Sequence, residues 1–125
     1  MNAPKTIQFS RISFSVIAWI FTIGITVQVL IAGLATFDNP VNWGYHISFA
    51  RGLFFLPIVM ALLAFFAQLP KKMIWRSVGL LGMVIGLFFT AAISARIGIL
   101  GALHPVIALF LFWNCIKVLS SFKKG

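Results

Sequence analysis

The chain has 125 residues, of which 62% are hydrophobic and 9% charged, and its net charge is +9. Soluble domains carry about 25% charged residues, so this composition excludes an ordinary soluble domain and indicates an integral membrane protein. The basic residues lie between apolar runs and form no single soluble patch, so nucleic acid is not an expected partner.

Four apolar runs follow one another along the chain. Each approaches the roughly 20 helical residues that are needed to cross about 30 Å of hydrocarbon. We predict spans over residues 12–36, 46–69, 77–100 and 105–122. The first run is longer than the roughly 7–15 apolar residues of a cleaved signal peptide, so we expect it to be retained. The runs are too long and uniformly apolar for barrel strands, which leaves helices as the structure that satisfies the backbone in lipid.

Short connections make consecutive helices antiparallel neighbours. The expected fold class is therefore all-α: an integral membrane four-helix bundle of up-down-up-down topology, formed by residues 1–125 as one domain. Pro57 is expected to kink the second helix, and Pro105 to lie in the first turn of the fourth. Gly82 and Gly86 are expected to let two helices approach closely.

Lysine and arginine are distributed unevenly between the two ends of the predicted helices. The connections on one side contain only the acidic Asp38. The side that carries both termini contains eight basic residues: Lys5, Arg11, Lys71, Lys72, Arg76, Lys117, Lys123 and Lys124. The positive-inside rule therefore predicts a multi-pass protein with its N- and C-termini in the cytoplasm.

The only two histidines, His46 and His104, each begin a predicted helix, and these two helices run in the same direction. We therefore expect the rings at similar depth on diagonal helices, whose axes are roughly 11–14 Å apart. That gap is too wide for direct ring contact but suits two imidazoles with a flat metal macrocycle between them. We predict that both histidines are axial ligands of a heme iron. Alternatively, each ring bonds only headgroups, water or a loop carbonyl.

Two arginines and a glutamine lie within the predicted spans. Arg51 and Arg96 are expected inside the outer ends of the second and third helices, where a charge is costly without a partner. Because the chain has one acid, the two propionates of a heme are candidate partners for them. Both could instead reach lipid phosphates, and their depth below the histidines conflicts with outward-pointing propionates. Gln28 either binds the cofactor or bridges two helices.

The stretches VQVLIAGLATF, WGYHISFARG and GALHPVIAL resemble an uncharacterised bacterial family of small four-helix membrane proteins, a domain of unknown function. This resemblance implies the fold and supplies no activity, and a bacterial cell membrane is the expected location. The chain also resembles, more loosely, one half of heme A synthase and small b-type cytochromes. His46 and His104 match the histidines on the second and fourth helices of that half, which implies heme b with two histidine ligands. The chain has half as many helices as heme A synthase and no acidic residue beside His46, so the heme-oxidising chemistry of that enzyme is not implied.

The expected function is therefore a membrane heme-b-binding protein that transfers electrons, because two axial histidines leave no open position on the iron. Its expected partners are the lipid bilayer and a quinone or a membrane redox protein. One alternative is a cofactor-free small subunit or assembly factor of a membrane complex. Another is a quinol or superoxide oxidoreductase whose arginines steer an anion. No hydrolase or kinase motif is found, and enzymatic activity and oligomeric state stay open.

Overall fold

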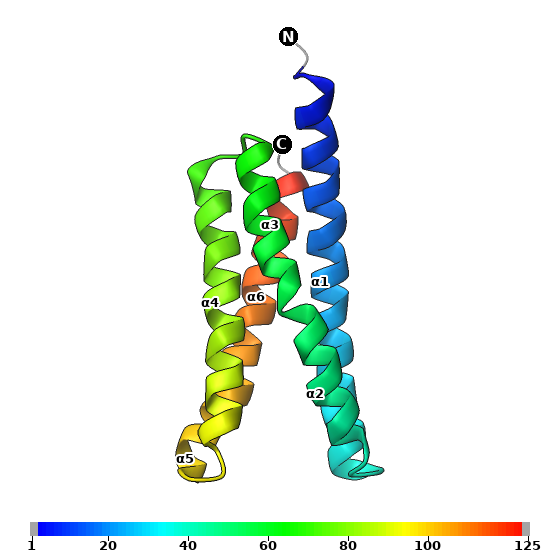
Figure 1. The fold of residues 1–125 in the computed structure, drawn as a ribbon, viewed down its shortest axis with the longest axis vertical. Coiled ribbons are helices and arrows are strands. Elements are labelled where there is room, and N and C mark those ends of the chain that lie inside the picture. Colours follow the sequence, from blue (N-terminus) through cyan, green and yellow to red (C-terminus); the bar gives the residue numbers. More distant parts are fainter. Residues whose placement is uncertain (1–2, 124–125) are drawn as a thin grey trace.

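The computed structural model describes residues 3–123. Over this range the chain is all-α and contains no strand. Its helices are α1 (Lys5–Phe37), α2 (Asn42–Leu53), α3 (Phe55–Phe66), α4 (Lys71–Ile93), α5 (Gly98–Gly101) and α6 (Leu103–Lys123). Because α2 and α3 follow each other in one rod, four long helical segments alternate in direction (Figure 1). All four are long and apolar enough to cross a membrane, which indicates a multi-pass membrane protein.

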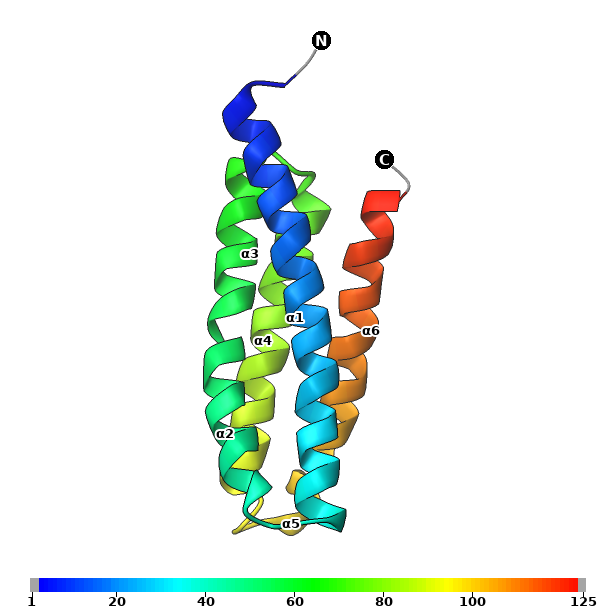
Figure 2. The same cartoon turned by 90° about the vertical axis from the view of Figure 1, so that its right-hand side faces the viewer.

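The helices form a four-cornered bundle. The helix α1 packs against α2, α3 and α6, whereas α4 packs against α3 and α6. The α2–α3 rod and α6 therefore occupy opposite corners, as expected for antiparallel neighbours joined by short connections (Figure 2). The start of α1, the end of α6 and the α3–α4 connection lie at one end of the bundle, called here the basic end. The α1–α2 connection and α5 lie at the other, called the histidine end.

Apart from Arg51 and Arg96, the basic residues that the structure describes lie at one end of the bundle, as the sequence predicts. Asp38 caps the C-terminus of α1 at the histidine end. Lys123 is the last residue of α6, and Lys124 lies outside the described residues. The basic end carries Lys5, Arg11, Lys71, Lys72, Arg76 and Lys117.

The second rod is interrupted at Phe54, one turn before Pro57. A proline has no N–H to donate to the carbonyl four residues earlier, here Leu53, and its ring crowds that carbonyl. The predicted kink is therefore present, but it lies toward the histidine end from the proline itself. Beyond the break, α2 packs against α1 and not against α4 (Figure 1).

The third predicted span is shorter than expected. We predicted a helix to residue 100, but α4 ends at Ile93 and a turn follows, in which the N–H groups of Arg96 and Ile97 donate to the Ile93 carbonyl at 2.9 Å. Glycine weakens helices, and Gly98 and Gly101 both lie in this stretch. A Cβ on Gly101 would lie 2.7 Å from the Ser94 Cβ, so the short α5 approaches the preceding turn more closely than alanine would allow.

The core is concentrated in the part of the bundle nearer the basic end. Its buried side chains are Phe14, Ala18, Phe21, Ile25, Leu53, Met60, Ala64, Met73, Leu80, Val84, Leu111, Cys115, Val118 and Leu119. Toward the histidine end the inward positions become small or polar, as at Ala35 and Thr90. Of the two glycines expected to bring helices together, a Cβ on Gly86 would meet Ile107 at 3.6 Å, whereas Gly82 faces open space.

Candidate functional site: a histidine pair between two diagonal helices

The structure brings His46 and His104 together at the histidine end. His46 lies in the first half of α2 and His104 is the second residue of α6. Their ring centroids are 6.4 Å apart and the ring planes are inclined at 55°. The rings are closer than the separation of two diagonal helix axes suggested, because both side chains reach inward from their backbones.

The His46 ring is fixed by a reciprocal pair of hydrogen bonds with Gln28 on α1. The His46 Nδ1 lies 3.2 Å from the main-chain oxygen of Gln28, and the Gln28 Nε2 donates to the main-chain oxygen of His46 at 2.7 Å. Trp43 packs edge-on against the ring, with centroids 5.5 Å apart. Because a carbonyl oxygen only accepts, Nδ1 carries the proton of the neutral ring and Nε2 keeps the lone pair.

The His104 ring is also held through its Nδ1, by two groups of α4. Its Nδ1 lies 2.9 Å from the Leu87 main-chain oxygen and 3.2 Å from the Thr90 Oγ1. The Thr90 hydroxyl donates to the Gly86 carbonyl at 2.9 Å, so its oxygen is available to accept from His104. In the neutral tautomer that these contacts favour, Nδ1 is again the donor and Nε2 of His104 has the lone pair.

The two rings share the arrangement that metal-ligating histidines adopt. Such a histidine donates one ring N–H to a carbonyl or carboxylate, which fixes the ring and leaves the other nitrogen free to coordinate. With metal–nitrogen bonds of about 2.0–2.1 Å and roughly 1.1 Å from nitrogen to ring centroid, two imidazoles on opposite sides of one metal have centroids roughly 6–6.5 Å apart. The observed 6.4 Å falls within that interval.

The chain matches one known protein family. Residues 28–95, more than half of the chain, match a family described as a family of unknown function, DUF6220. The chain belongs to DUF6220. This confirms the predicted membership in an uncharacterised family. The match includes Gln28 and His46, and DUF6220 carries no described activity. No curated protein matches the chain, and no solved structure matches it.

Gln28 bridges two helices in this DUF6220 protein, which was one of the two roles expected for it. Its Nε2 is used by the main chain of His46, and its Oε1 is buried without a hydrogen-bond partner among the described residues. Exchanging the two amide atoms would place an acceptor against the His46 carbonyl, so the orientation is fixed. Beside His46, therefore, stands a buried acceptor that a bound molecule or an ordered water can satisfy.

The two arginines do not join the histidine pair. Arg51 is exposed, and five residues after His46 its side chain lies about 140° around α2 from that ring. Arg96 is also exposed and lies in the turn after α4, not in the last turns of a helix as predicted. Within residues 3–123 no group of three or more His, Cys, Asp or Glu side chains is gathered for a metal ion.

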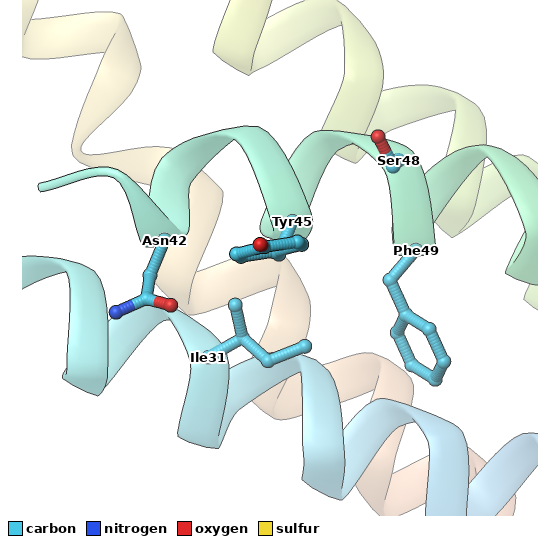
Figure 3. A pocket seen from close by; sticks show the side chains of 5 residues that line it. All are labelled: Ile31, Asn42, Tyr45, Ser48 and Phe49. Atoms are coloured by element: carbon cyan, nitrogen blue, oxygen red, sulfur yellow. The ribbon is translucent and has the colours of Figure 1, made fainter.

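An open pocket of about 540 Å³ lies near the pair, between α1 and α2. Figure 3 shows Tyr45 lying over Ile31, with Asn42, Ser48 and Phe49 around them. Tyr45 and Ser48 are exposed, whereas the adjacent His46 is half-buried and bonded to Gln28. The pocket and the histidine pair are therefore separate features of α2.

Proposed function

We propose that this DUF6220 protein binds heme b in the bacterial cell membrane, with His46 and His104 as its axial ligands, and that it serves in electron transfer. The observation that carries the proposal is the histidine geometry: centroids 6.4 Å apart and each Nδ1 held by a main-chain carbonyl. The imidazoles of His46 and His104 would hold the heme iron, and the heme would supply the redox chemistry. Full coordination by the protein and the macrocycle favours electron transfer over oxygen chemistry.

The surroundings of the pair support a flat group. The large buried side chains of the core end near Val84 and Leu111, while the buried Thr90 contacts His104. The helix α2 leaves α4 uncovered there, since it packs only on α1 and α3. We propose that the macrocycle would lie between α1 and α4 at this level, where α2 makes no contact with α4.

The arginines contribute differently from each other in this proposal. Arg96 lies in the exposed turn at the histidine end, and we propose that it would bind a propionate that points toward water. Arg51 is exposed, and we propose that it would bind a lipid phosphate or a membrane redox partner. A quinone is the proposed electron donor because it shares the membrane with the protein.

The termini are proposed to lie in the cytoplasm, because the basic end carries nearly all the lysine and arginine. The test is cysteine labelling of the Lys72→Cys variant in a Cys115→Ser background. In intact cells a membrane-impermeant maleimide should leave it unlabelled, and lysis should expose it. Labelling in intact cells would reverse the orientation.

Absorption spectroscopy tests the heme site directly. Protein purified in mild detergent after expression with ample heme should show a Soret band and the sharp reduced bands of a low-spin, six-coordinate iron. His46→Ala and His104→Ala should each give a high-spin spectrum or no heme, and added imidazole should restore the low-spin form. Tyr45→Ala, which removes an exposed neighbour of His46, is the matched control and should retain the wild-type spectrum.

Two results would contradict the heme proposal. Wild-type protein without a Soret band would favour a cofactor-free subunit or assembly factor. A single histidine variant with the wild-type spectrum would show that this histidine is not a ligand.

A further inference from the structure

A second polar feature lies at the basic end, far along the bundle from the histidines. It is a hollow of about 360 Å³ between α4 and α6, called here the basic pocket. Three cationic side chains line it, with a tryptophan and two serines: Lys72, Arg76, Lys117, Trp113, Ser120 and Ser121. No part of the proposed heme site uses these residues.

Arg76 is the fixed element of the basic pocket. Its side chain is half-buried, and its Nη1 donates to the Ser121 Oγ at 2.9 Å and to the Lys117 carbonyl at 3.5 Å. These bonds connect α4 to α6 and hold the guanidinium in place. A guanidinium has five N–H donors in a planar fork, so further donors remain for an oxyanion.

The other two cations lie around Arg76 on both helices. Lys72 is in the first turn of α4, and the Lys117 Nζ lies 5.6 Å from the centroid of the Trp113 ring on α6. The only acidic residue of the chain, Asp38, caps α1 at the histidine end. No acidic side chain of the protein therefore lies at the basic end to balance these three cations.

The shape of the basic pocket indicates which anion would balance these cations. Its cations lie toward the end of the bundle, and Trp113 lies one turn further into α6, with 59% of its surface exposed. Tryptophan is enriched where the membrane meets water. A phospholipid matches this order, since its phosphate lies at the surface and its glycerol and acyl chains lie deeper, beside the indole. A free phosphate ion makes no use of the apolar wall.

We propose that the basic pocket binds the phosphate headgroup of an anionic phospholipid, with Arg76, Lys72 and Lys117 as the phosphate ligands and Trp113 beside the lipid chains. Basic pockets between transmembrane helices are a recurring type of anionic-lipid site. The bound lipid would add a link between α4 and α6 to that of Arg76 and Ser121.

Native mass spectrometry of the full chain in detergent tests this proposal with two lipids, phosphatidylglycerol and phosphatidylcholine. Phosphatidylglycerol should bind at least roughly tenfold more tightly, and each of Lys72→Gln and Lys117→Gln should weaken it about fivefold. The control is Lys71→Gln, which removes an exposed charge from the same turn of α4 without lining the pocket. It should change the affinity less than twofold.

Arg76 needs its own control because it also joins two helices. Ser121→Ala removes the same 2.9 Å bond and leaves all three cations, so it should retain lipid binding that Arg76→Gln loses. Equal loss in both variants would overturn the assignment of Arg76 as a phosphate ligand. Equal affinity for the two lipids, or a Lys71→Gln effect as large as that of Lys72→Gln, would overturn the site. Displacement of the lipid by equimolar inorganic phosphate would overturn the lipid as its occupant.

Discussion

Gly24 on α1 is a position where the cost of a single steric clash to the stability of the bundle can be measured. A Cβ at Gly24 would lie 2.5 Å from the Leu53 Cδ2, well inside the 3.5–4.0 Å at which carbon atoms attract. Leu53 is 7% exposed and ends α2 at the helix break, so its methyl group must move by about 1 Å into packed surroundings. Overpacking of this kind costs about 1–3 kcal/mol.

In a helix, alanine is also more favourable than glycine by about 0.8–1 kcal/mol. The measured effect of Gly24→Ala alone therefore underestimates the cost of the clash. Gly82→Ala is the matched control, because a Cβ at Gly82 meets nothing within 4 Å. We expect Gly24→Ala to be less stable than Gly82→Ala by about 1–3 kcal/mol. The measurement is the free energy of unfolding by SDS titration in mixed micelles.

A double-mutant cycle with Leu53→Ala then assigns the cost to the contact. Removing the leucine methyl groups should relieve the clash, so the two substitutions should be coupled by about 1–3 kcal/mol. A coupling below about 0.5 kcal/mol would refute the reasoning. An equal loss of stability in Gly82→Ala would refute it as well. Gln28 lies one turn after Gly24, so the same displacement should loosen the Gln28–His46 bonds and lower heme content.

Three further substitutions have defined expected outcomes. Gln68→Gly should stabilise the protein by about 1 kcal/mol in the same titration, because Gln68 adopts a left-handed φ of 53° after α3, and a loss of stability would contradict this. Thr90→Val should lower heme retention more than its control Thr36→Val. Both substitutions remove a hydrogen bond to a carbonyl of the same helix, but only Thr90 also contacts His104. Equal heme retention in the two variants would refute a role for that contact. Pro57→Ala should restore a helical N–H and straighten the second rod, so its low-spin heme signal should fall, whereas an unchanged spectrum would show that the break does not set the position of the histidine.

The arrangement of the helices was predictable because it depends on coarse properties of the sequence. Apolar runs of sufficient length identified four helical segments, and short connections placed the second and fourth on opposite corners. Two histidines at the starts of parallel helices could therefore be expected at one level. Their separation required the rotation of each helix about its own axis, which connections do not determine.

The partners of the histidines could not be predicted for the same reason. These helices are apolar on all sides, so the hydrophobic period does not mark the inward face. Thr90 and the Leu87 carbonyl become partners of His104 only because α4 turns that face toward α6. In the sequence, the one feature that pointed to a polar partner for His104 was Thr90, a hydroxyl residue inside an apolar span. The end of α4 at Ile93 was missed because hydropathy continues through Gly98 and Gly101, whose effect is on the backbone.

The unequal packing of the two ends divides the bundle into regions of different local stability. Amide exchange by local opening requires little free energy where few apolar side chains are buried, as in α2, whose one buried residue is Leu53. The segment from Phe14 to Ile25, by contrast, lies against the core and should exchange only with global unfolding. A ligand that joins α2 to α6 would thus slow exchange mainly in the half that holds it. Loss of such a ligand would therefore loosen the histidine end first, while the closely packed half would keep its protection.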